Sequence, residues 1–88
     1  MRGDDLDTRR RRAAFRATHR GTKEMDWLLG RYATAVLPSL EGPELDRLER
    51  LLGLSDPELH RWLHSPQLAA GSEFAGLVTE LRRFHGLE

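Results

Sequence analysis

Two histidines, His60 and His64, have a type and spacing that could do chemistry. They are four residues apart, so on a helix both imidazoles share one face and could bind one metal ion. No third ligand is evident nearby in the sequence, and Arg61 follows His60 where a zincin motif has Glu. We therefore expect no metal here, and two solvent-exposed histidines flanking a buried Trp62.

Four consecutive arginines, Arg9–Arg12, begin the most basic part of the chain. Residues 8–23 carry seven basic residues and no acidic one, whereas residues 24–88 carry eleven acidic residues and six Arg. Clustered guanidinium groups neutralise phosphates, so a small nucleic-acid-associated regulator is one interpretation. The acidic remainder and the net charge of zero favour a solvated or protein-facing helix, and we expect no nucleic-acid partner.

Other signatures of catalysis or of the membrane are absent from the 88 residues. Without Cys there is no disulfide framework, no thiolate zinc cluster and no Cys nucleophile, and a reducing compartment is the default. Glycine-rich phosphate loops and the G-x-S-x-G motif are also missing. No apolar run is long enough to span a bilayer. We expect a protein that is not an enzyme and does not insert into a membrane.

The apolar residues follow a helical spacing throughout, which predicts an all-α fold. We expect one compact domain over residues 1–88, a bundle of about five short helices. Residues 1–7 are predicted to form a flexible tail. Asp7 or Thr8 can cap the first helix, which is predicted to run to about His19.

The second helix has the clearest pattern in the chain. Gly21 is predicted to end the first helix with a positive φ, and Thr22 to cap the second. The apolar stripe that follows has the i, i+3, i+4, i+7 spacing of a buried face. Its members are Met25, Leu28, Leu29, Tyr32, Ala33, Val36 and Leu37.

Three shorter helices complete the predicted bundle. The third ends at Gly53, and its apolar residues are Leu45, Leu48, Leu51 and Leu52. Ser55 and Glu58 form a capping box for the fourth, which ends at Ser65. A loop then leads to Ser72, the predicted cap of the fifth helix. The apolar face of the fifth comprises Phe74, Leu77, Val78, Leu81 and Phe84.

Trp27 is the exception in the second helix. At 100° per residue it lies almost opposite the apolar stripe, with Glu24 and Arg31 on either side of its face. Two interpretations are open. The first helix covers and buries Trp27, or Trp27 stands at the surface beside Arg20, Glu24 and Arg31 as a protein-binding hot spot.

Two short segments have distinctive patterns. Residues 20–24 have the pattern R-G-x-x-E, with Arg20, Gly21 and Glu24. Residues 54–63 contain the pattern D-P-x-L-x-x-W-L, whose residues are Asp56, Pro57, Leu59, Trp62 and Leu63. Together the two segments resemble the SdhE-type family of succinate dehydrogenase assembly factors, the FAD assembly factors of bacteria and their mitochondrial relatives.

The resemblance implies a five-helix chaperone that is not itself an enzyme. Such a factor binds the flavoprotein subunit of succinate dehydrogenase, and in some bacteria that of fumarate reductase, and promotes the autocatalytic covalent attachment of FAD. It implies that FAD belongs to the partner and that this chain binds no cofactor stably. The expected location is the bacterial cytoplasm, or the mitochondrial matrix if a transit peptide has been removed.

The resemblance also implies an interface at the junction of the first two helices. Arg20, Gly21 and Glu24 would lie close to the flavin-attachment region, with Asp26 and Trp27 as adjacent candidates. Trp27 departs from the aliphatic residue that the family has there. Arg20 could donate its planar guanidinium to a partner carboxylate, and Glu24 could accept hydrogen bonds from a partner. Arg31, beside Trp27, completes the predicted partner-binding set.

Overall fold

Five α-helices and two short 3-10 turns form the computed structural model, which describes residues 2–87, with side chains from residue 5 onward. They are α1 (Arg2–Thr18), α2 (Lys23–Val36), η1 (Leu37–Ser39), α3 (Gly42–Leu52), α4 (Asp56–His64), η2 (Pro66–Ala69) and α5 (Ala75–Phe84). Residues 2–87 contain no strand. The predicted all-α bundle of five helices is confirmed.

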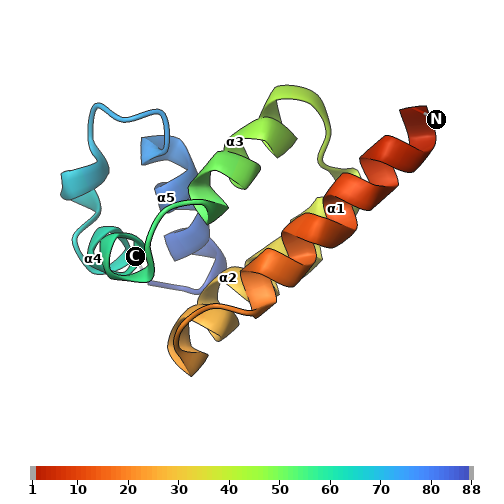
Figure 1. Ribbon diagram of the computed structural model, residues 1–88. Coiled ribbons are helices and arrows are strands. Elements are labelled where there is room, and N and C mark those ends of the chain that lie inside the picture. Colours follow the sequence, from red (N-terminus) through yellow and green to blue (C-terminus); the bar gives the residue numbers. More distant parts are fainter. Residues whose placement is uncertain (1, 88) are drawn as a thin grey trace.

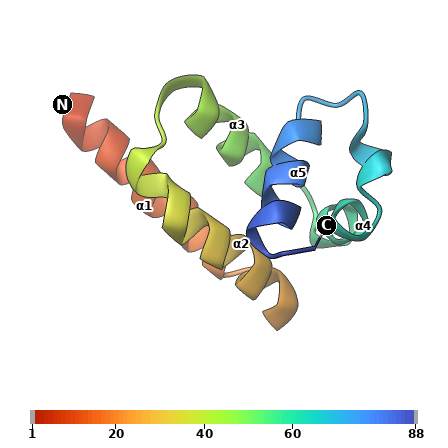
Figure 2. The ribbon, with the colours of Figure 1, turned by 180° about the vertical axis from the view of Figure 1, so that it is seen from behind.

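The two longest helices, α1 and α2, form an antiparallel pair that is visible from both sides of the molecule (Figures 1 and 2). Gly30 of α2 is buried where the helices meet, and a Cβ at Gly30 would lie 2.9 Å from Thr18 Cγ2 of α1. The absence of a side chain therefore permits this close approach. The N-terminal end of α1 projects beyond the rest of the bundle, whereas α4 and α5 lie around the start of α2 (Figure 1).

The core between the helices is apolar, and no polar or charged residue from position 5 to 87 is buried. The leucines predicted for the third helix and most of the α2 stripe are buried; Val36 is half-buried. Tyr32 also joins α2 to α5, because its hydroxyl donates to Glu80 Oε1 over 2.8 Å. Burial, followed by this hydrogen bond, raises the pKa of Tyr32.

The caps of α2 and α4 are confirmed. Thr22 Oγ1 accepts from Met25 N over 3.1 Å, and Ser55 Oγ accepts from Glu58 N over 3.4 Å. The predicted start of α5 lies too early in the sequence. Ser72 Oγ accepts from Phe74 N in the turn that precedes the helix, and the helix itself begins at Ala75.

The start of α1 corrects the sequence prediction, because the helix begins at Arg2 and not after Asp7 or Thr8. Asp7 lies inside the helix and pairs with Arg11 one turn later over 2.8 Å. Acidic residues near a helix start, followed by bases four residues on, stabilise such an extension. Met1 lies outside the described residues, and the flexibility of residues 1–7 stays a prediction.

Phe84 corrects the predicted core of the fifth helix. Its side chain is 45% exposed at the end of α5, whereas Val78 and Leu81 are buried. The ring instead meets Tyr32 edge-on, with centroids 5.6 Å apart. Helical periodicity identifies the face on which Phe84 lies but does not indicate where along that face the core ends.

Candidate functional site

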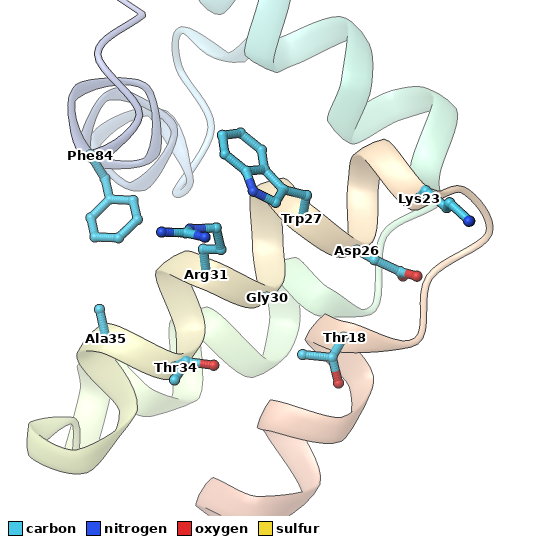
Figure 3. Close-up of a pocket in the computed structure, with 9 residues that line it drawn as sticks. All are labelled: Thr18, Lys23, Asp26, Trp27, Gly30, Arg31, Thr34, Ala35 and Phe84. Atoms are coloured by element: carbon cyan, nitrogen blue, oxygen red, sulfur yellow. The ribbon is translucent and has the colours of Figure 1, made fainter.

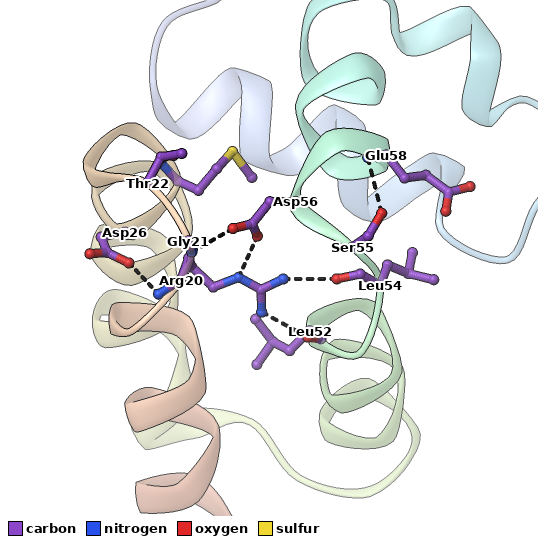
Figure 4. A network of polar contacts seen from close by, with 10 residues as sticks. Arg20, Gly21, Thr22, Asp26, Leu52, Leu54, Ser55, Asp56 and Glu58 are labelled. Carbon is purple, nitrogen blue, oxygen red and sulfur yellow. Dashed lines mark hydrogen bonds and ion pairs between the residues drawn. The ribbon is translucent and has the colours of Figure 1, made fainter.

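Arg20, in the turn between α1 and α2, connects that turn to the start of α4. Its Nε donates to Asp56 Oδ1 over 2.8 Å. Nη1 donates to Leu52 O over 2.7 Å, and Nη2 donates to Leu54 O over 2.8 Å. Figure 4 shows the guanidinium reaching across the gap between these segments. The side chain is 9% exposed. The guanidinium is thus hydrogen-bonded within this chain, and its contact with a partner carboxylate stays a prediction.

Asp56 receives a second set of contacts from the same turn. Gly21 N donates to Asp56 Oδ2 over 2.6 Å, and a Cβ at Gly21 would lie 2.8 Å from that oxygen. Gly21 does not have the predicted positive φ. The space needed by the Asp56 carboxylate explains the glycine instead. We call the contacts of Arg20 and Gly21 with Asp56 the Arg20 clamp.

The electrostatics of the clamp favour an ionised Asp56. Partial burial acts to raise the pKa of this carboxyl group, but the hydrogen bonds from Gly21 N and from the Arg20 guanidinium outweigh burial, so the pKa is lowered. Asp26 adds a further tie, because its carboxylate accepts a hydrogen bond from the backbone N–H of Arg20. Asp26 is half-buried and therefore also contributes to the turn.

Glu24 has a different environment from Arg20 and Gly21, because its carboxylate lies at the surface. Its two oxygens face the two histidines of α4: Oε1 is 3.4 Å from His60 Nε2, and Oε2 is 3.6 Å from His64 Nε2. The imidazole centroids are 4.2 Å apart. All three side chains line a surface groove of about 830 Å³.

The structure therefore supplies the third potential ligand that was not found near His60 and His64 in the sequence. The exposure of both histidines is confirmed, whereas Trp62 between them is half-buried and not buried as predicted. Glu24 belongs to another helix, and only the docking of α2 against α4 brings it to the histidines. No local spacing in the sequence could have identified it.

Trp27 lies at the surface, 51% exposed, which decides between the two interpretations of its position. Arg31 stacks on it, with Cζ 5.6 Å from the ring centroid. Its other neighbour is His85, whose ring centroid is 4.7 Å away. His85 is held in turn by a 2.8 Å contact between Nε2 and Leu28 O. The contact with His85 was missed because it depends on how α5 packs against α2.

A second groove, of about 730 Å³, runs along this part of α2. Figure 3 shows Trp27 and Arg31 on one side of the groove and Phe84 reaching toward it from α5. Glu24, Trp27 and Arg31 are all exposed, and their spacing of three and four residues places them along one side of α2. We call these three residues the α2 face.

The arginine run of α1 is partly occupied by contacts within the chain. Arg9 forms ion pairs with Asp46 Oδ1 over 2.6 Å and with Glu49 Oε1 over 2.7 Å, both on α3. Arg10 Nε donates to Leu40 O over 2.9 Å. Two of the four guanidinium groups thus hold α1 to the rest of the bundle.

Among the described helices, none combines the length and the apolar character needed to cross a membrane.

Comparison with known proteins gives a family model and several relatives whose descriptions agree. The family model described as flavinator of succinate dehydrogenase matches residues 11–85. The FAD assembly factor SdhE of Acetobacter pasteurianus is 47% identical over 60 residues, which are 68% of this chain and 55% of that protein. The mitochondrial succinate dehydrogenase assembly factor 2 of Lodderomyces elongisporus is 33% identical over 60 residues, 68% of this chain and 37% of that protein.

The corresponding factor of Yarrowia lipolytica is 33% identical over 60 residues, 68% of this chain and 41% of that protein. The matched segment therefore spans 55% of the bacterial relative and about two fifths of these yeast relatives. No solved structure matches the chain. Because the family model covers most of the sequence, including both segments of resemblance, the chain belongs to the family of succinate dehydrogenase flavinators, the SdhE-type assembly factors.

Proposed function

We propose that this protein binds the flavoprotein subunit of succinate dehydrogenase and promotes the autocatalytic covalent attachment of FAD to it. Family membership supports this function. The structural observation that carries it is the α2 face, where the Arg31 guanidinium lies over the half-exposed Trp27 indole and the exposed Glu24 carboxylate precedes Trp27 by three residues. An aromatic residue and an arginine at a surface are typical of protein-binding hot spots.

Each member of the α2 face offers a different contact. Trp27 provides a broad apolar surface whose orientation is restricted by its contacts with Arg31 and His85. The exposed Glu24 carboxylate can accept hydrogen bonds from a partner's arginine or backbone amides. Because the Arg20 clamp fixes the start of α2, these groups are presented with little loss of conformational freedom on binding.

The protein acts in this proposal as a chaperone and not as an enzyme. It holds the partner so that the subunit's own histidine and its bound FAD are correctly positioned for covalent attachment, and correct positioning of two reacting groups is sufficient to accelerate their reaction. FAD is bound by the partner, and this chain holds no cofactor stably. In a bacterium the complex forms in the cytoplasm, and where fumarate reductase carries covalent FAD, its flavoprotein is a second client.

The test is co-expression of the flavoprotein with the wild-type chain, with Glu24→Ala or with Trp27→Ala, followed by in-gel flavin fluorescence after denaturation. Both variants are expected to lower the yield of covalent flavin. Gln67→Ala, an exposed substitution on η2, is the matched control and should leave the yield unchanged. Circular dichroism checks that each variant is folded. If omitting the protein altogether leaves covalent flavin at the wild-type level, the proposal is wrong.

A further inference from the structure

We propose that Glu24, His60 and His64 form a binding site for a divalent transition-metal ion of the Zn²⁺ type. Each of the three side chains presents one ligand atom, and these atoms all lie within 4.8 Å of one another. Two neutral imidazoles and one carboxylate form a donor set that Zn²⁺ accepts in proteins. The set arises from two helices, and neither helix supplies it alone.

The spacing of the ligand atoms suits a tetrahedral ion. Zn²⁺ binds imidazole nitrogen and carboxylate oxygen at about 2.0–2.2 Å, so two ligand atoms at a tetrahedral angle lie roughly 3.3–3.6 Å apart. Each histidine faces a different oxygen of Glu24: His60 Nε2 lies 3.4 Å from Oε1, and His64 Nε2 lies 3.6 Å from Oε2. With one ligand atom from each side chain, the three atoms lie within 4.8 Å of one another, and side-chain rotation brings them to the tetrahedral spacing when the ion binds.

The Arg20 clamp provides the rigid frame for these ligands. Its hydrogen bonds join Gly21 to Asp56, one helical turn before Glu24 on α2 and one turn before His60 on α4. Figure 4 shows this connection between the two helix starts. His64 follows one turn later on the same face of α4. The relative position of the ligand-bearing turns is therefore fixed in the absence of metal, and less conformational entropy is lost on binding.

The donor set also predicts selectivity. Imidazole nitrogen suits Zn²⁺, Ni²⁺ and Cu²⁺, whereas Mg²⁺ and Ca²⁺ prefer oxygen ligands and larger numbers of them. With three protein ligands at an exposed position, a tetrahedral ion retains one position for water or for a group from another molecule.

A consequence follows that rests on the proposed function. In these two proposals the Glu24 carboxylate is both a metal ligand and a member of the α2 face. An oxygen lone pair that binds the ion cannot at the same time accept a hydrogen bond from a partner. Zn²⁺ is therefore expected to weaken binding of the flavoprotein, and the flavoprotein to weaken binding of Zn²⁺ by the same factor.

The site itself is tested on the free 88-residue chain by isothermal titration calorimetry with zinc chloride in a buffer that does not chelate metals. The wild type is expected to bind one Zn²⁺ per chain and to show no comparable affinity for Mg²⁺. Glu24→Gln, His60→Ala and His64→Ala should each lower the affinity for Zn²⁺ at least about tenfold. His19→Ala, which removes an exposed histidine at the end of α1, is the matched control and should leave the affinity unchanged.

Three results would overturn the site: no Zn²⁺ binding by the wild type, equal affinity in the wild type and Glu24→Gln, or an equal loss in His19→Ala. Circular dichroism of each variant confirms that the helices are intact. The competition is measured separately, as flavoprotein affinity with and without Zn²⁺, and equal affinities contradict only the competition. Because the calorimetry contains no flavoprotein and the flavinylation assay needs no added metal, failure of one proposal is distinguishable from failure of the other.

Discussion

The first and last residues of the Arg20-Gly21-x-x-Glu24 segment have opposite environments. Arg20 is nearly buried and directs its guanidinium to a carboxylate and two carbonyl groups of its own chain. Glu24, one turn further along, is exposed and faces the surface histidines of α4. A short motif can therefore combine a residue that holds helices together with a residue that is exposed at the surface. Substitutions at its two ends should have different consequences.

The largest expected effect on stability comes from Arg20→Ala. The substitution leaves the Asp56 carboxylate without its cation and two carbonyl oxygens without donors, which should lower the free energy of unfolding by about 2–4 kcal/mol. Urea denaturation measures this change. Arg11→Ala removes an exposed ion pair within α1 and should cost no more than about 0.5 kcal/mol. An equal loss of unfolding free energy in the two variants would contradict the claim that the Arg20 clamp stabilises the fold more than an exposed ion pair does.

Gly21→Ala should have the next largest effect. Its Cβ would meet Asp56 Oδ2 at 2.8 Å, so the carboxylate must shift from the Gly21 N–H, at a cost of about 1–2 kcal/mol. Gly76→Ala on α5 is the matched control, because its Cβ meets nothing within 4 Å and alanine favours the helix. Thermal or urea unfolding should therefore show opposite signs for the two substitutions, and a stabilising Gly21→Ala would contradict the account of the clamp.

The clamp also predicts a loss of stability in acid. The pKa of Asp56 in the folded protein lies below its ordinary value of 3.8. Its stabilising contribution is therefore complete at neutral pH and is lost as the pH falls from about 4 through the folded-state pKa. Because the Arg50 side chain also lowers the pKa of Glu73, the wild type must be compared with Asp56→Asn. The difference in unfolding free energy should shrink between pH 5 and pH 3, and a constant difference would contradict this.

Trp27→Ala should have the smallest effect on stability and a clear effect on function. Half of the side chain is already exposed, so we expect a change of at most about 1 kcal/mol in the free energy of unfolding. The yield of covalent flavin should nevertheless fall, as measured by fluorescence of the denatured flavoprotein. If stability falls as far as in Arg20→Ala, Trp27 belongs with the residues that build the surface.

Local signals in the sequence predicted most of the fold. The caps at Thr22 and Ser55 and the leucines of α3 are determined by neighbours within one or two turns, and spacing alone identifies them. The extent of α1 and the exposure of Phe84 were missed, because helix ends and core limits depend on competition between weak signals and on packing.

The candidate site was predicted only in part, because most of its contacts join distant segments. The surface position of Trp27 was one of two open interpretations, and packing of α1 and α5 decided it. The partners of Arg20 and the position of Glu24 beside His60 depend on how α2 docks against α4. Gly21 was predicted to be needed for a positive φ, whereas the structure shows that it leaves space for the Asp56 carboxylate. A sequence does not distinguish these two reasons for a glycine.

The hydrogen bond between Arg20 and Asp56 also determines when the surface can exist during synthesis. These residues are 36 positions apart, so the contact closes a long loop and cannot form until α4 has been made. The antiparallel pair of α1 and α2 can meet earlier, because its contacts lie closer in sequence. A nascent chain interrupted before residue 56 therefore carries Glu24 and Trp27 without the frame that the clamp supplies, and the surface proposed to bind a partner is complete only after Asp56 has been made.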